Sequence, residues 1–325
     1  MDEDAATLQV DAQEATRIIA AMSIGNYIKV IGRGKDGARA LTREQAADLF
    51  GQVLDGTASD LEIGAFCLAM RIKGETPAEM AGFLDATEAR LHKLPASNAA
   101  IVVLPSYNGA RKLPVLTPLL GLLLARAGAA VLLHGSATED ARVSSAEVLQ
   151  ALGRPALSAM RPLAAGELAH APTELLCPGL KRLLDVRRVV GLRNPAHSLV
   201  KLMNPCAGPS LVVASYTHPE YAQSMAATFA LTGANALLLR GTEGEPVADA
   251  RRTPAMELLH GGVARLVQEA QGGALAALPQ LPAIDAPATA TYIRAVLAGD
   301  LPVPAPIACQ VQHILQALRD IAQLR

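Results

Sequence analysis

The sequence predicts an α/β protein with a small all-helical domain and a larger α/β domain, whose mainly parallel central sheet is flanked by helices. Three helical segments with short connections follow one another before residue 95. Beyond them, short apolar runs alternate with helical segments, as in parallel strands joined by crossover helices. Aromatic residues are 3% of the chain and Trp is absent, which disfavours a β-sandwich.

The first helical segments carry recognisable start and stop signals. Thr42 precedes Glu44 and Gln45 as a helix cap does, and Pro77 suits the first turn of a later helix. Ser59 or Asp60 caps the helix between them. We expect these helices at about residues 42–54, 59–73 and 77–91.

The rest of the chain reads as alternating strands and helices. A short apolar run bounded by Pro or Gly indicates a buried strand. We expect strands at residues 101–104, 130–135, 211–214 and 236–240, and helices at 145–152, 219–231, 288–298 and 307–324.

Composition and charge narrow the possible classes of protein. Four cysteines lie far apart, which favours reduced thiols in a cytoplasmic protein over a metal site or disulfides. The N-terminus is acidic, unlike a secretory signal, and the most apolar stretch, Val115 to Leu133, is broken by Pro118 and Arg126. We therefore expect no membrane span.

Basic residues concentrate in two segments although the net charge is −1. Five lie between Lys29 and Arg43 with Asp36 as the single acid, and six lie between Lys181 and Lys201 with Asp185. A neutral chain with such segments can carry an anion-binding face.

Several blocks occur in an order that resembles a known family. They are Leu41–Glu44, Gly56–Asp60, Ile63–Phe66, Lys73–Pro77, Ala127–Gly153 and Val186–Pro205. Together they resemble anthranilate phosphoribosyltransferase and the related pyrimidine nucleoside phosphorylases over roughly residues 25–250. The resemblance implies a helical domain in residues 1–95 with a returning segment at about 180–205, and an α/β domain in the rest of residues 96–325.

The family's diphosphate site is largely missing from this sequence. Its Gly-Thr-Gly-Gly-Asp loop reads Leu104-Pro-Ser-Tyr-Asn108, where proline removes a backbone donor and larger side chains replace glycines. Of its Asn-x-Ser-Thr only Thr117 remains, and its magnesium-binding Asp-Glu falls at about Pro246-Val247. Glu243 and Glu245 lie nearby as the available substitutes. We expect no catalytic residue, no metal and no cofactor.

A second set of residues resembles the non-enzymatic YbiB-like branch of the same superfamily. It comprises Pro105–Lys112, Arg193-Asn194, Ala196-His197, Lys201, His218–Tyr221 and Gly241–Glu245. Members of that branch are homodimers that bind DNA and RNA without marked sequence preference. The resemblance therefore implies sequence-independent nucleic-acid binding by basic grooves, and dimerisation through the helical domain.

Two groups of candidate residues follow. The candidate nucleic-acid-binding residues are Lys29, Arg33, Lys35, Arg39, Arg71, Lys73, Arg111, Lys112, Arg187, Arg188, Arg193 and Lys201. A remnant of the family's pocket is expected at Ser106, Tyr107, Asn108, Gly109, Thr117, His134 and Gly135. The plainer interpretations are exposed basic turns, an interdomain ion pair at Arg187 and a neutral core histidine at His134.

Alternative functions stay open at this point. One is a phosphoribosyl or pentosyl transferase with a rebuilt phosphate site, and another is a protein-interaction adaptor whose basic patches are incidental. Tyr107, Tyr216 and Tyr221 are candidates for stacking on bases. With so few aromatics, phosphate contacts should dominate, so that binding would be salt-dependent and tolerant of sequence.

Overall fold

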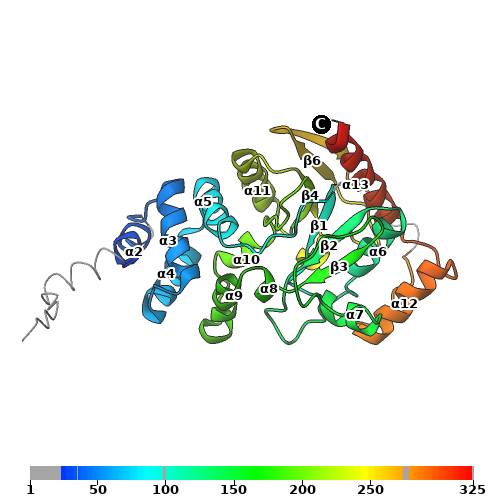
Figure 1. The fold of residues 1–325 in the computed structure, drawn as a ribbon, viewed down its shortest axis with the longest axis horizontal. Coiled ribbons are helices and arrows are strands. Elements are labelled where there is room, and N and C mark those ends of the chain that lie inside the picture. Colours follow the sequence, from blue (N-terminus) through cyan, green and yellow to red (C-terminus); the bar gives the residue numbers. More distant parts are fainter. Residues whose placement is uncertain (1–22, 35, 98–99, 274–277, 324–325) are drawn as a thin grey trace, which may run out of the picture.

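The structure is a computed structural model that describes residues 23–34, 36–97, 100–273 and 278–323. It contains a helical bundle at one end of the molecule and a larger part built on one central sheet (Figure 1). The expected fold class is thereby confirmed. In the described part of the chain, no helix combines the length and apolar character that a membrane crossing requires.

Three described helices of the bundle begin where the capping signals predicted, and a further helix before them was not predicted. The bundle consists of α2 (Gly25–Ile31), α3 (Arg43–Asp55), α4 (Asp60–Lys73) and α5 (Pro77–Glu88). Thr42, Ser59 and Thr76 each form a full capping box, in which the side chain three residues later bonds back to the cap. Helix α5 is shorter than predicted, since it ends at Glu88 rather than at about residue 91.

In the part of the chain that the structure describes, seven strands form one sheet in the order β3-β2-β1-β4-β5-β6-β7. The strands are β1 (Ile101–Pro105), β2 (Ala130–His134), β3 (Leu168–Ala171), β4 (Ser210–Tyr216), β5 (Ala236–Arg240), β6 (Met256–His260) and β7 (Val263–Gln268). The strands β3, β2, β1, β4 and β5 pair in parallel, whereas β5 with β6 and β6 with β7 pair antiparallel. The carboxyl ends of β1, β2, β4 and β5 therefore share one edge.

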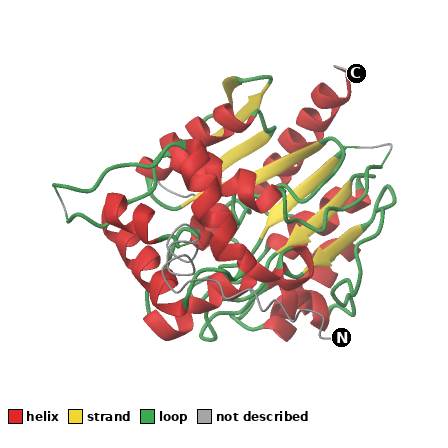
Figure 2. Cartoon of the chain, turned by 60° about the vertical axis from the view of Figure 1, so that its left-hand side comes forward, coloured by secondary structure: helices red, strands yellow, loops and turns green. Residues whose placement is uncertain are grey.

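Helices cover both faces of this sheet (Figure 2). Alternate residues of β1 show the two layers, since Ile101 and Val103 share a core with Phe229 of α11 (Pro219–Thr232). On the other face, Val102 and Leu104 share a core with α6 (Thr117–Arg126) and α13 (Ala305–Gln323). The remaining helices are α7 (Ser145–Ala151), α8 (Thr173–Leu176), α9 (Pro178–Val190), α10 (Ala196–Leu199) and α12 (Ala286–Ala298), with a short 3-10 turn at Thr242–Gly244.

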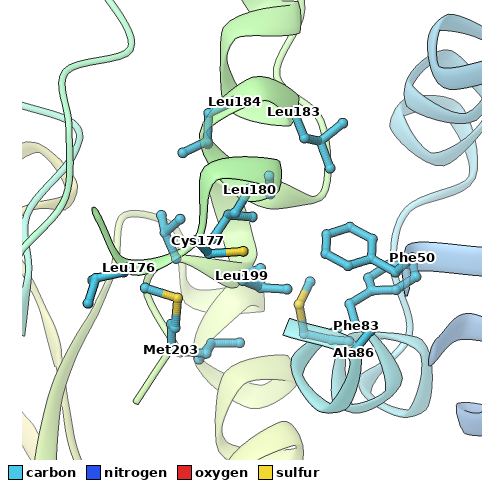
Figure 3. Close-up of a cluster of buried hydrophobic side chains, with 14 of the residues drawn as sticks. Phe50, Phe83, Ala86, Leu176, Cys177, Leu180, Leu183, Leu184, Leu199 and Met203 are labelled. Atoms are coloured by element: carbon cyan, nitrogen blue, oxygen red, sulfur yellow. The ribbon is translucent and has the colours of Figure 1, made fainter. Parts of the chain in front are cut away.

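The chain returns to the helical bundle through α9 and α10. Leu180 and Leu183 of α9 and Leu199 of α10 lie near Phe50 and Phe83 (Figure 3), whose rings stack with centroids 4.7 Å apart. A Cβ at Gly179 would lie 2.1 Å from the Leu54 carbonyl oxygen, so only glycine allows α9 to approach α3 this closely. The boundaries at residue 95 and at about 180–205 stay predictions, and this packing is the observation that bears on them.

Candidate functional site

The remnant pocket residues lie together at the carboxyl edge of the sheet. Ser106 to Gly109 follow β1, and His134 with Gly135 end β2 beside them. The Ser106 backbone N–H donates to the His134 carbonyl at 2.7 Å. A Cβ at Gly135 would lie 2.3 Å from the Ser106 carbonyl oxygen, so the two loops touch through their backbones. Ser106, Tyr107, Asn108, Thr117 and His134 are all buried.

The carboxylate of Glu245 occupies the centre of this pocket. One of its oxygens accepts the backbone N–H groups of Asn108 at 3.0 Å and Gly109 at 2.9 Å. The other accepts the hydroxyls of Ser106 and of Thr117, the latter at 3.0 Å. Glu245 is fully buried, and burial raises the pKa of its carboxyl, while the four donors oppose that rise.

The carboxylate of Glu243 lies in a second ring of donors on the same loop. Its Oε1 accepts the backbone N–H groups of Arg111, Lys112 and Leu113 at 3.3, 2.8 and 3.0 Å. Consecutive N–H groups converging on one oxygen form an anion-binding concavity of the kind called a nest. The Arg142 guanidinium approaches the same carboxylate at 3.5 Å.

The backbone from Gly241 to Glu245 is shaped to deliver both carboxylates. Glu243 has φ 52°, and among the described residues it is the one non-glycine residue with positive φ. A Cβ at Gly241 would lie 1.9 Å from the Glu245 carbonyl oxygen, and Gly244 has φ 89°. A left-handed residue costs about 1–2 kcal/mol, so the carboxylate contacts must offset that strain.

Cations surround the two carboxylates. The Arg193 guanidinium donates to the Asn108 side-chain oxygen at 2.5 Å, and the Lys201 ammonium donates to the Ser215 carbonyl at 3.2 Å. Burial, aided by Arg193, lowers the pKa of Lys201 to about 8, while Glu245 opposes this shift. The pocket is therefore an anion-binding environment whose anions belong to the protein itself.

Ion pairs join this edge to the returning helix α9. Arg187 contacts Glu139 at 2.9 Å, and Arg142 contacts the same carboxylate at 2.9 Å. Arg188 contacts Asp140 at 2.8 Å. The helix that packs on the bundle is thus tied to the loop that follows β2.

The predicted basic residues fall into three groups. The first, which we call the bundle-end group, lies exposed at the C-terminal ends of α2 and α4 and comprises Lys29, Arg33, Arg39 and Arg71. The second, the strand-end pair, is formed by the exposed Arg111 and Lys112. The third has protein partners: Lys73 pairs with the buried Glu79, and the contacts above engage Arg187, Arg188, Arg193 and Lys201. Lys35 lies outside the described residues.

The two candidate histidines are buried and held neutral. Burial lowers the pKa of His134 to about 3, and burial together with Arg193 and Arg187 lowers that of His197 to about 3. Tyr107 packs edge-on against His197 with ring centroids 6.0 Å apart. Because Tyr107 is only 3% exposed, the idea that it stacks on bases is wrong; Tyr221, at 45%, remains accessible.

We expect acid to destabilise the fold between pH 6.5 and 3 through these histidines. In that range the unfolded chain takes up protons at His134 and His197 while the folded chain does not, so unfolding is favoured as pH falls. Each histidine should contribute about 1.4 kcal/mol per pH unit. Urea unfolding at pH 7 and pH 5 measures this loss, and the variant His134→Leu with His197→Gln should show a shallower one. An equal loss in that variant would assign the acid sensitivity to other groups.

Glu243 and Glu245 do not resemble a metal site in this structure. Their oxygens accept N–H and O–H groups, and a cation would meet those donors rather than lone pairs. The described residues contain no group of three His, Cys, Asp or Glu side chains placed to hold a metal ion.

Sequence reasoning found the pocket but missed part of its content. It named Glu243 and Glu245 as possible magnesium ligands and as part of a stretch that resembles the YbiB-like branch, and it did not single out Glu139 or Arg142. One usable signal was the spacing in Gly241-Thr-Glu-Gly-Glu245, where glycines on both sides allow an unusual backbone. Nothing in the local sequence indicated that the loop after β1 would face these residues.

Comparisons with known proteins agree with the architecture. Residues 26–90 match the helical bundle domain of the glycosyl transferase family. The protein YbiB of Escherichia coli (strain K12) is 39% identical over 93% of this chain and 97% of its own length. An anthranilate phosphoribosyltransferase of Sorangium cellulosum is 30% identical over 80% of this chain and 76% of its own length.

Solved structures show the same fold. Anthranilate phosphoribosyltransferase from Thermus thermophilus has a TM-score of 0.67 at 22% identity, covering 92% of this chain and 89% of that one. The Saccharomyces cerevisiae protein in complex with PRPP and Mg has a TM-score of 0.62 at 12% identity, covering 94% of each. Fold and site thus define a protein on a phosphoribosyltransferase scaffold. The chain belongs to the anthranilate phosphoribosyltransferase superfamily. YbiB is one of its relatives in that superfamily.

Proposed function

We propose that this protein binds DNA or RNA without sequence preference and does not transfer phosphoribosyl groups. The observation that carries the proposal is the occupation of the backbone N–H donors of the loop after β1 by the carboxylates of Glu243 and Glu245. Because the N–H donors of this loop are already bonded to carboxylates, they are not available to bind a diphosphate. The similarity to YbiB extends over nearly the whole chain, and the resemblance to the YbiB-like branch implies the binding function.

The exposed basic residues support phosphate contacts at the surface. In the bundle-end group, Arg33 donates to the Lys29 carbonyl at 3.1 Å and Arg39 to the Asp36 carbonyl at 2.9 Å. Neither arginine has a carboxylate partner within ion-pair distance in the described part of the protein, so both keep their full charge for an anion. The strand-end pair adds two more exposed cations.

Fluorescence anisotropy with an oligonucleotide of about 30 residues tests the proposal. Single strand and duplex, each in two unrelated sequences, are titrated at about 50 and 200 mM salt. We expect binding that differs little between sequences and weakens steeply with salt. Absence of binding at the lower salt would refute the function and favour an adaptor role.

Phosphoribosyl transfer is the second candidate function. The observation in its favour is the cluster of Arg142, Arg193 and Lys201 around the loop, which suits a polyanionic substrate. An anthranilate phosphoribosyltransferase of Sorangium cellulosum is 30% identical to this chain. Incubation with phosphoribosyl pyrophosphate, Mg²⁺ and anthranilate should give no product under our proposal, and product formation would replace it with this candidate.

We propose further that the protein is a cytoplasmic homodimer joined through α4. Leu61, Leu68 and Ile72 are 85%, 47% and 66% exposed and lie at spacings of seven and four residues, which place them on one helix face. An exposed apolar stripe of this kind marks a protein interface, and a second copy of the same helix is its simplest partner. All four cysteines are free thiols, which suits the cytoplasm.

The dimer proposal predicts that Leu68→Glu with Ile72→Glu gives a folded monomer. Charges on both sides of a two-fold interface would repel each other and lose apolar burial. Light scattering after gel filtration measures the mass. Val263→Glu with Leu266→Glu on the exposed strand β7 is the matched control and should leave the dimer intact. A dimer that survives the α4 changes would move the interface elsewhere.

A further inference from the structure

The loop after β1 carries two separate anion stations. The backbone N–H groups of Asn108 and Gly109 point to one acceptor, and those of residues 111–113 point to another. Backbone donors arranged in this way bind phosphate oxygens as readily as carboxylate oxygens. Two stations within one short loop suit a ligand with two linked anionic groups, or two single anions.

Both stations are filled by one short segment of the same chain. Glu245 supplies the first carboxylate and Glu243 the second, and Gly244 stands between them. The segment holds Glu243 in the left-handed region, where a residue with a side chain is strained. The Ser215 hydroxyl donates to the Gly244 carbonyl at 2.7 Å, which fixes the segment against the end of β4.

We propose that Glu243 and Glu245 are built-in substitutes for phosphate groups, and that the loop at residues 106–113 is a latent phosphate or diphosphate site closed by the chain's own segment 241–245. The inference does not depend on nucleic-acid binding. Arg142, Arg193 and Lys201 balance the two carboxylates. Without the carboxylates, these cations and five backbone N–H groups would face an empty space that a phosphate fits in charge and in donors.

The test removes the carboxylates and supplies inorganic anions. Glu243→Ala with Glu245→Ala should melt at a lower temperature than the unchanged protein. Inorganic phosphate or diphosphate at about 10 mM should raise that temperature by several degrees, because a ligand that binds only the folded state stabilises it. Sodium chloride of equal ionic strength should not. Isothermal titration should show diphosphate binding at least tenfold tighter than to the unchanged protein.

Two further variants keep the test decisive. Glu243→Ala alone changes the more accessible carboxylate, whose side chain is 16% exposed, and should open one station to inorganic phosphate without loss of the fold. Glu174→Ala removes a carboxylate at the same sheet edge that accepts the Ser136 hydroxyl, and it should create no phosphate binding.

The outcomes separate clearly. Phosphate-specific stabilisation of Glu243→Ala, or of Glu243→Ala with Glu245→Ala, supports the proposal if it is absent from Glu174→Ala. Glu243→Ala alone decides if the double variant does not fold. If either Glu243 variant folds but binds phosphate no better than the unchanged protein, the proposal is overturned. Equally tight diphosphate binding by the unchanged protein also overturns it, because the carboxylates would then not close the site.

Discussion

Replacing Arg33 and Arg39 together by glutamate is expected to weaken nucleic-acid binding by about tenfold or more at low salt. The loss should be similar for every sequence, and for single strand and duplex alike. In a plot of the logarithm of the binding constant against the logarithm of the salt concentration, the slope should become less negative by about two. This corresponds to about one unit for each lost phosphate contact. Both effects are read from the same anisotropy titrations.

The physical reason lies in how these two arginines are held. Within the described residues, Arg33 and Arg39 donate only to backbone carbonyls and are otherwise exposed, so their charge is available to a polyanion. The backbone N–H of Arg39 bonds to the Val30 carbonyl at 3.1 Å, which places the residue beside α2. Substitution of exposed residues like these changes stability by about 0.5 kcal/mol or less, so a binding defect should appear without unfolding.

A matched pair elsewhere separates local contact from total charge. Arg252 and Arg294 are also exposed and donate to backbone carbonyls, those of Gly273 and Ala151. Arg252→Glu with Arg294→Glu changes the net charge by the same amount on a different part of the molecule. If both double variants lose affinity equally, the bundle-end group has no special part and total charge governs binding.

The limits of prediction from sequence are visible in particular elements. Helix starts were readable because Thr42, Ser59 and Thr76 bond within their own first turn, and such local chemistry is written in consecutive residues. Strand β3 was missed because Leu168-Ala-His-Ala171 is short and has little strand character. The β6–β7 hairpin was also missed, although its Gly261-Gly262 pair is a sequence signal for a two-residue turn. Both glycines take positive φ in the structure, as such a turn requires.

For the site too, the sequence predicts local features but not contacts between residues that are distant in sequence. Family resemblance located the pocket at residues 106–109, and chain order alone placed those residues at a strand end. The side-chain contacts of Glu245 join residues 100 to 139 positions apart in sequence, so no local pattern could pair them. The same holds for the basic residues, because composition cannot tell the exposed Arg111 from the paired Arg188.

The largest loss of stability is expected from Glu79→Ala, at about 3–5 kcal/mol. Glu79 is fully buried, and one oxygen accepts the Leu41 backbone N–H at 2.9 Å. The other accepts the Lys73 ammonium at 2.7 Å and both donors of Thr76 at 2.9 Å. Alanine would leave Lys73, only 10% exposed, without its counter-charge, and it would remove the Glu79 carboxylate from the capping box of α5 while the Thr76 cap itself stays.

Glu88 provides the matched comparison because it lies on the same helix and also pairs with a lysine. Its carboxylate contacts Lys93 at 2.7 Å but is 64% exposed, so Glu88→Ala should cost well under about 1 kcal/mol. Urea unfolding of both variants gives the two free energies. Lys73→Leu combined with Glu79→Leu should recover part of the loss, since it leaves no unpaired buried charge. Similar losses for Glu79→Ala and Glu88→Ala would show that burial does not set the strength of the Glu79 contacts, and the bundle would then depend mainly on its phenylalanine core.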